Sequence, residues 1–277
     1  MAIPHARVSL MSREEMRKEE HIHGGAGSIL LAGLFYEEEF QTPWFFLHTA
    51  ILLPGGGIGH HRHDDCEEIF ITIDNASQFT HNGRTAEVVG GAAVPVRVGE
   101  THAIYNHTDQ ETRWYNLKVI DPEGQWKSTD LGDDRVGVPL ESRDRLPVGR
   151  FDRGLLQYGQ SHEGKGEIGS RGIWGPQDFR TNIYAVNHGV LPPDSSIGYH
   201  WHETIEECYV IMNGRGRMTV DDETFEVLSS DVVLNHLGKR HGIYNHTEED
   251  LEVFTVSVSM KKGEYDCTEV GDDLSKR

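Results

Sequence analysis

Cysteine is scarce in this chain. The 277 residues include three cysteines, Cys66, Cys208 and Cys267. An odd number without paired spacing does not form a disulfide framework. We therefore interpret them as small buried side chains beside other features of the fold, with a redox or nucleophilic role as the alternative.

Long apolar runs and basic clusters are also missing. The sequence has no run of eighteen apolar residues and no basic-then-apolar N-terminus with a small-residue cleavage site. Neither a membrane span nor a secretory signal is indicated, so a cytoplasmic location is the default expectation. Lys and Arg number 26 against 45 Asp and Glu, for a formal net charge of −19. That balance argues against a nucleic-acid partner, which would require a basic face.

A pattern of histidine and glutamate occurs twice, and every member of the second copy follows the first by 139 residues. Pro54, Gly59 and the run Tyr105–Thr108 recur at the same offset, as Pro193, Gly198 and Tyr244–Thr247. A fixed internal period predicts two copies of one structural unit. The repeated residues are His61, His63, Glu68 and His102 in the first copy and His200, His202, Glu207 and His241 in the second.

Each set has the composition of a metal site. In a strand, side chains two residues apart point the same way, so His61 and His63 are expected to face one direction. Three imidazoles and one carboxylate suit a divalent transition ion. We expect Fe(II) or Mn(II), with Ni, Zn, Cu and Co as alternatives, and up to one ion in each copy.

The residues outside these sets predict an all-β fold. Short β-branched and aromatic runs alternate with Gly, Pro, Asn and Asp, which is typical of antiparallel sandwiches or barrels. We expect one domain at 28–120, a connector at 121–169, a second domain at 170–260 and a mobile polar tail at 261–277. In the lead-in 1–27, Ser12–Glu15 resembles a capping box for a short helix that ends near Glu20. His21 and His23 are interpreted as a solvated helix end, or as an adventitious ion site.

The repeated motifs resemble those of the cupin superfamily. The first motif is Gly59-His60-His61-Arg62-His63 with Glu68, and Gly198-Tyr199-His200-Trp201-His202 with Glu207; the second is Gly99–Asn106 and Gly238–Asn245. Arg97 and His236 replace the usual Pro, and Asn75 replaces a Gly, at turns. Two motif pairs resemble the bicupins. The resemblance implies two tandem cupin-type jelly-roll barrels, each a double-stranded β-helix with a divalent ion held by three His and one Glu.

Several neighbours are candidates for chemistry or substrate binding. Glu67 and Glu206 precede the expected ligands, could compete with them, and are candidate acids or bases together with Tyr209. Strand alternation places Phe70 and Tyr209 in the cavity, since they lie two residues past the glutamates. Substrate contacts are also expected from Arg97, which could bind an anion, with an ion pair on the surface as the alternative. Asn106 and Asn245 are expected to contribute as well, with simple turn formation as the alternative.

Three functions fit such a site. The preferred one, by resemblance, is a cofactor-independent dioxygenase that acts on a small metal-chelating substrate. The alternatives are a non-redox isomerase, decarboxylase or lyase acting on a small hydroxy or keto acid or sugar derivative, and a bicupin that binds a ligand or metal without catalysis. Exposed edge strands and the N-terminal segment, as an exchanging arm, predict a homodimer or higher oligomer.

Overall fold

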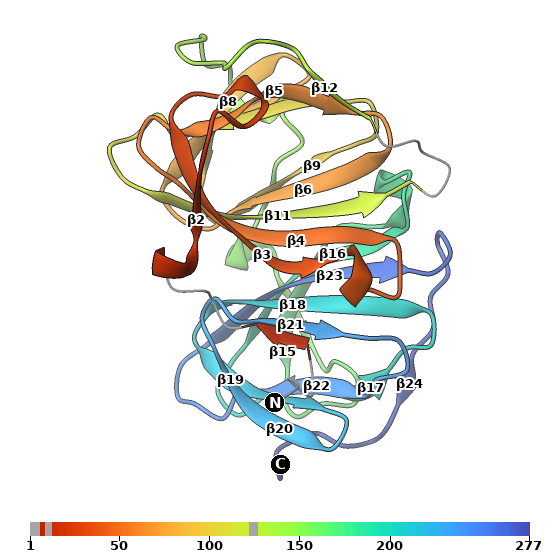
Figure 1. Ribbon diagram of the computed structural model, residues 1–277. Helices are drawn as coiled ribbons and strands as arrows, with labels where there is room; N and C mark the ends of the chain where they lie inside the picture. Colours follow the sequence, from red (N-terminus) through yellow and green to blue (C-terminus); the bar gives the residue numbers. More distant parts are fainter. Residues whose placement is uncertain (1–5, 9–12, 122–126) are drawn as a thin grey trace.

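The protein is all-β. The computed structural model describes residues 6–8, 13–121 and 127–277, and these contain 24 strands, six short 3-10 helices and no α-helix. The strands form four antiparallel sheets, which build two barrels stacked one on the other (Figure 1). Within the described residues, no helix has the length and apolar character needed to cross a membrane.

Each barrel consists of a five-stranded and a seven-stranded sheet. The first contains β2 (Arg17–Glu20), β3 (Ser28–Tyr36), β4 (Trp44–Leu52), β5 (Gly57–His63), β6 (Cys66–Thr72), β7 (Ala76–His81), β8 (Arg84–Val89), β9 (Ala92–Val96), β10 (Thr101–Tyr105), β11 (Thr112–Ile120) and β12 (Ser128–Asp130). The second contains β14 (Gln157–Gly159), β15 (Ile168–Trp174), β16 (Ile183–Leu191), β17 (Ser196–Trp201), β18 (Ile205–Asn213), β19 (Arg215–Val220), β20 (Glu223–Leu228), β21 (Val232–Asn235), β22 (His241–Tyr244), β23 (Leu251–Ser259) and β24 (Thr268–Glu269).

Two short strands cross between the barrels. β1 (Ala6–Val8), which precedes the first barrel, pairs with β21 of the second. β13 (Gly149–Arg150), which precedes the second barrel, pairs with β9 of the first. Each crossing strand covers an edge of the other barrel's large sheet. An edge paired in this way no longer exposes unsatisfied backbone groups.

The two large sheets face each other, and their shared core joins the barrels. β6 is buried along its whole length because both of its faces are covered. Ile69 and Ile71 belong to the apolar cluster shared with Val210 and Val256 of the second barrel. Phe70, between them, packs into the interior of the first barrel. Continuous burial on both faces explains why Ile69, Phe70 and Ile71 are apolar in succession rather than in alternation.

A reciprocal pair of buried glutamates also connects the barrels. Glu67 accepts hydrogen bonds from the backbone N–H groups of Arg180 and Thr181 at 2.9 and 2.7 Å and from the Thr181 hydroxyl at 2.6 Å. Glu206, 139 residues later, accepts the equivalent bonds from Gln41 and Thr42 of the first barrel. Each carboxylate thus anchors a loop of the opposite barrel.

The N-terminal lead-in differs from the expected helix. Arg13–Glu15 form the 3-10 helix η1, and Arg17–Glu20 then form β2, which pairs with β3. Ser12 lies outside the described residues. A strand forms here because β2 gains a ladder of backbone hydrogen bonds with β3, whereas a short isolated helix is marginal. The other 3-10 helices are η2 (Ile22–Gly24), η3 (Glu37–Glu39), η4 (Arg143–Arg145), η5 (Arg153–Leu155) and η6 (Pro176–Asp178).

The C-terminal segment is part of the fold rather than a loose tail. β24 pairs with β17, opposite His200, as β12 pairs with β5 opposite His61. The backbone N–H of Tyr199 donates to the carbonyl of Asp272, and in the first barrel the N–H of His60 makes the equivalent bond to the carbonyl of Asp133. The repeat therefore extends past the expected ends of both domains, into the connector and the C-terminal segment.

Candidate metal centres

Strand pairing brings each set of four residues together inside a barrel. His61 and His63 lie two residues apart on β5, Glu68 lies on β6, and His102 on β10 is paired with His61 across the sheet. One ligand atom from each residue falls within 4.8 Å of all the others. The second set, on β17, β18 and β22 with His202 just past the end of β17, converges in the same way. We call these the first and second quartets.

Hydrogen bonds orient the rings toward a common point. His61 Nδ1 lies 2.8 Å from the Gly59 carbonyl, which directs Nε2 inward, and His200 repeats the contact with Gly198 at 2.8 Å. His102 Nε2 lies 3.1 Å from Glu68, and His241 Nε2 lies 3.1 Å from Glu207. A backbone partner on one ring nitrogen sets the tautomer that leaves the other nitrogen available as a ligand.

At His202 the nearby Glu207 carboxylate outweighs burial and raises the pKa. Burial keeps four of the other quartet imidazoles neutral, which is the form that binds metal. It lowers the pKa of His61 to about 2 and the pKa values of His63 and His102 to about 3, and it lowers the pKa of His200 well below its usual value. The buried Nε2 atoms of His200 and His202 lack a hydrogen-bond partner among the described residues. Buried polar atoms normally have a partner. A divalent cation at the centre of the second quartet would supply it, and the first quartet presents the same set of donors.

Glu207 is held as a carboxylate by the same geometry. Burial by itself would raise its pKa, but the rings of His202 and His241, whose Nε2 atoms lie 3.7 and 3.1 Å from its Oε2, outweigh that effect and lower the pKa well below its usual value. Ser257 adds a hydrogen bond of 2.5 Å to the other oxygen. In the first barrel a lysine replaces this serine: Lys118 Nζ lies 3.8 Å from Glu68 and 3.5 Å from His63 Nδ1.

A fourth histidine stacks on each quartet. His23 lies flat on His61, with ring centroids 3.8 Å apart, and its Nδ1 lies 2.6 Å from Asp130. His162 lies on His200 at 3.6 Å and contacts Glu269 at 3.0 Å. His23 is therefore not a solvated helix end, because β2 and η2 fold it over the quartet. His162 follows His23 by the repeat offset of 139 residues, and Glu269 follows Asp130 by the same offset. The sequence alone could therefore have indicated both histidine–carboxylate pairs.

The cavity beside the first quartet is mainly apolar and contains one buried ammonium group. Its volume is about 240 Å³. Lys118 is 2% exposed and lies over the rings of Phe45 and Phe46, 5.5 and 5.8 Å from their centroids. His48 lies on the wall, and its Nε2 has no hydrogen-bond partner among the described residues. Burial lowers the pKa of His48 to about 4. Aromatic walls come from Phe46, Phe70 and Trp114.

The second cavity has the same volume, about 240 Å³, but a different chemical character. Tyr209 replaces Phe70, and Asn187 replaces His48 at the 139-residue offset. His188 is buried and contacts Glu252 at 2.7 Å. The remaining wall is largely polar, with Ser170, Arg171 and Thr255. The two barrels therefore share a ligand set but present different surfaces to a small molecule.

The expected cavity residues Phe70 and Tyr209 do line the cavities. Their rings lie 5.2 Å from His102 and 5.9 Å from His241. Burial, followed by the nearby Glu207 carboxylate, raises the pKa of Tyr209 well above its usual value. At neutral pH this hydroxyl is a hydrogen-bond donor rather than a base, so its catalytic role stays a prediction.

Glu67 and Glu206 do not reach the quartets. Both belong to the inter-barrel contacts described above, and the His236 ring adds a further contact to Glu206 at 2.7 Å. Adjacent residues of a strand point to opposite faces, so Glu68 and Glu207 face the barrel interior and their neighbours face the other barrel. The structure thus removes Glu67 and Glu206 as candidate acids or bases beside the ion.

The other three expected substrate contacts have structural partners instead. Arg97 Nε donates to the Asp178 carbonyl of the second barrel at 2.6 Å. Asn106 donates to the carbonyls of Leu52 and Gln110. Asn245 makes the equivalent bonds to Leu191 and Glu249. None of the three lines either cavity. The asparagines match the alternative of turn formation, because their amides fix the loops that follow β10 and β22.

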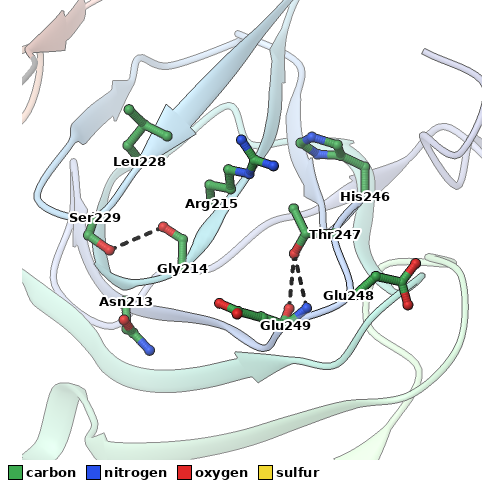
Figure 2. A pocket seen from close by; sticks show the side chains of 9 residues that line it. All are labelled: Asn213, Gly214, Arg215, Leu228, Ser229, His246, Thr247, Glu248 and Glu249. Atoms are coloured by element: carbon green, nitrogen blue, oxygen red, sulfur yellow. Dashed lines mark hydrogen bonds between the residues drawn. The ribbon is translucent and has the colours of Figure 1, made fainter.

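A third hollow, of about 780 Å³, lies on the outer surface of the second barrel (Figure 2). It is bordered by the hairpin at Asn213–Gly214 and by residues 246–249. Hydrogen bonds inside it close local turns: Ser229 donates to the Gly214 carbonyl and Thr247 to the Glu249 carbonyl (Figure 2). No member of either quartet lines it, so the two barrel cavities remain the candidates for chemistry.

Sequence comparisons match parts of the chain to a family model and to two curated proteins. Residues 187–257 match the family model described as a cupin domain. An oxalate-binding protein of Thermotoga maritima is 30% identical over 97 residues, which cover 35% of this chain and 80% of that protein. An uncharacterized protein of Methanocaldococcus jannaschii is 35% identical over 81 residues, 27% of this chain and 65% of its own length.

Structure comparisons extend the likeness to both barrels. An oxalate decarboxylase of Bacillus subtilis superposes with a TM-score of 0.64 at 16% identity, over 95% of this chain and 79% of that one. An oxalate decarboxylase of Lactobacillus farciminis, in complex with formate, gives 0.63 at 15% identity, over 98% and 90%. At such low identity the superpositions establish the shared two-barrel fold and nothing about the reaction.

Proposed function

Because this chain belongs to the cupin superfamily, as a two-barrel bicupin metalloprotein, we propose that it is a metal-dependent enzyme that removes carbon dioxide from a small carboxylate such as oxalate. The first barrel is its reaction site. The resident ion is divalent, and Mn(II) is the first candidate. Manganese suits a mixed imidazole and carboxylate set, and the structure of the Bacillus subtilis decarboxylase describes Mn(II) centres.

The observation that carries this proposal is Lys118. An ammonium group that is 2% exposed, in a cavity of about 240 Å³ next to the first quartet, is a binding site for an anion small enough to reach the ion as well. Buried charges are normally paired, and Glu68, 3.8 Å from Lys118, places this ammonium group directly beside the ion-binding quartet. The second barrel has Ser257 at this position, and the cation on its cavity wall is the half-buried Arg171 rather than a fully buried ammonium group. The asymmetry favours the first barrel for a carboxylate substrate.

Each wall of the first cavity has a role in such a reaction. His61, His63, Glu68 and His102 would hold the ion, which supplies Lewis-acid chemistry when bound. Lys118 orients one carboxylate and neutralises its charge. Phe46, Phe70 and Trp114 exclude water from the carbon–carbon bond that breaks. When that bond breaks, the electron pair stays on the remaining fragment, which takes up a proton as carbon dioxide leaves.

His48 is the candidate for that proton transfer. It lies on the cavity wall, and its Nε2 has no hydrogen-bond partner among the described residues. An imidazole can take a proton from solvent and pass it on, which a dry aromatic wall cannot do. The second barrel has Asn187 at the equivalent position, which cannot transfer protons in this way.

The comparisons favour this decarboxylase alternative over the dioxygenase preferred from the motifs. The two functions differ in oxygen stoichiometry, because a dioxygenase consumes one O2 for each substrate and a decarboxylase consumes none. Carboxylate binding without turnover is the second candidate, since the Thermotoga maritima relative is described as an oxalate-binding protein. Isothermal titration with oxalate would then give a complex without products.

The test is product and oxygen measurement on the manganese-loaded protein. With oxalate, we expect formate and carbon dioxide in equal amounts and no stoichiometric O2 uptake. Lys118→Met should lower kcat/KM by about 10- to 100-fold, since a hydrogen bond to a charged group contributes about 1.5–3 kcal/mol. Ser257→Ala is the matched control in the second barrel and should leave turnover unchanged. Oxygen uptake equal to substrate loss, or full activity of Lys118→Met, would contradict the proposal.

A further inference from the structure

A second cluster of metal-ligand side chains lies beside the second quartet. His162, on the loop before β15, meets Cys267 and Glu269 of the C-terminal segment. His162 Nδ1 lies 3.0 Å from Glu269 Oε1 and 3.4 Å from Cys267 Sγ, and the sulfur lies 3.5 Å from the same carboxylate oxygen. Three different donor types therefore occupy the corners of one small triangle.

The size of that triangle suits a tetrahedral ion. Zinc bonds of about 2.0–2.3 Å at tetrahedral angles place neighbouring donors about 3.3–3.6 Å apart. The observed separations of 3.0–3.5 Å need shifts of only a few tenths of an ångström at most. The side chains of His162 and Glu269 are 24% and 36% exposed, so an ion can enter from solvent and keep water as a fourth ligand.

The first barrel contains the same arrangement without the sulfur. His23 contacts Asp130 at 2.6 Å, as His162 contacts Glu269, and both histidines stack on a quartet histidine. The residue in the place of Cys267 is Ser128. Both barrels thus have a histidine–carboxylate pair at this position. Only the second barrel adds a thiol, that of Cys267, to the pair. A serine hydroxyl is a poor ligand for a soft ion, whereas a thiolate is a strong one.

We propose that His162, Cys267 and Glu269 form a third metal site, which takes Zn(II) or a similar thiophilic ion. The sulfur makes it chemically distinct from the quartets, whose nitrogen and oxygen donors also suit Mn(II). A bound ion would link the loop before β15 to the C-terminal segment, with both flanking the ring of His200. The site exists whichever reaction the first barrel performs.

Cobalt is the probe for this site, because Co(II) takes zinc geometries and gives a near-ultraviolet charge-transfer band when bound to thiolate. The full-length chain is loaded with manganese and then titrated with Co(II). We expect one equivalent of thiolate-bound cobalt per chain. Cys267→Ser copies the first barrel and should abolish the band, and Glu269→Gln should weaken cobalt binding at least 10-fold. Manganese content at the quartets, measured for each variant, reports that the barrels remain folded.

The matched gain-of-function variant is Ser128→Cys, which builds the same three donors in the first barrel. It should add a second equivalent of thiolate-bound cobalt. A wild-type chain without the band, or a band that survives in Cys267→Ser, would overturn the proposal. A Ser128→Cys chain with unchanged signal would show that the histidine–carboxylate pair is not the metal-binding scaffold. Cys208 is 1% exposed and serves as the internal control for non-specific thiol binding.

Discussion

Adjacent glutamates in β6 have opposite roles. Glu68 faces the barrel interior and contacts His102 at 3.1 Å. Glu67, one residue earlier, faces the second barrel and accepts hydrogen bonds from Arg180 and Thr181. The pair repeats as Glu207 and Glu206. A change of one position along a strand reverses the direction of the side chain, so chemically identical residues separate into a ligand candidate and an anchor.

This separation predicts different effects on metal content. Glu68→Gln should reduce bound manganese from about two ions per chain to about one, because an amide is a weaker ligand than a carboxylate for such an ion. Glu207→Gln should do the same for the second barrel, and the double variant should lose both ions. Elemental analysis after loading measures this directly. Glu67→Gln is the control and should retain both ions; equal metal loss in Glu67→Gln would contradict the assignment.

At the scale of elements, strands and loops of one barrel complete the other. β1 and β13 each cross to the opposite large sheet. The loops at Thr42 and Thr181 are held by glutamates of the opposite barrel. These contacts are added to a shared apolar core, so the barrels are expected to unfold as one unit rather than separately.

Glu67→Gln should therefore lower the stability of the whole protein. The carboxylate accepts bonds from two backbone N–H groups and a hydroxyl, and an amide group cannot accept all three with the same strength. The free energy of unfolding should fall by about 1–3 kcal/mol, the cost of weakening a buried charged hydrogen bond. Urea unfolding measures the change. Turnover per metal-loaded chain should stay at the wild-type level; a loss of turnover without a loss of stability would restore Glu67 as a catalytic candidate.

At the scale of the whole molecule, the protein combines a surface of negative net charge with buried neutral histidines. The formal charge of −19 favours solubility and repels like surfaces. Burial lowers the pKa of His48 to about 4 and the pKa values of His63 and His102 to about 3. These groups stay neutral in the fold at pH values where an unfolded histidine is already protonated.

The metal-free protein should consequently lose stability in mild acid. A histidine whose pKa is lower in the folded state stabilises the fold above about pH 6.5, and that stability falls as pH decreases, because the unfolded chain binds more protons. Each such group contributes up to about 1.4 kcal/mol per pH unit. Urea unfolding at about pH 7 and about pH 5.5 should show the decline, since carboxylates titrate mainly below this range.

His48→Asn provides the control, because asparagine occupies the equivalent position of the second barrel. The variant should reduce the stability difference between the two pH values by about 1 kcal/mol. Equal stability of the wild-type protein at both pH values would show that the histidines do not titrate as their burial implies.

Spacing alone was sufficient for the all-β class, the duplication and the membership of both quartets. A period of 139 and a strand repeat of two are local properties, so they can be read without knowing how strands pair. The same rule could have separated Glu67 from Glu68. The offset also predicts that His23 and His162 occupy equivalent positions in the two barrels. The expected helix in the N-terminal lead-in obscured this equivalence.

Tertiary contacts alone decided which neighbours of the quartets have room for a substrate and which hold the barrels together. The side chains of Arg97, Asn106 and Asn245 donate hydrogen bonds to backbone carbonyl groups far away in the sequence. Lys118 and His48 come from the middle of strands, without a motif, and face the first cavity only because β4 and β11 line it. The C-terminal segment carries Cys267 to His162 across more than a hundred residues. Such long-range pairing depends on the closed barrels, because the free energy of packing, not local sequence, brings these groups together.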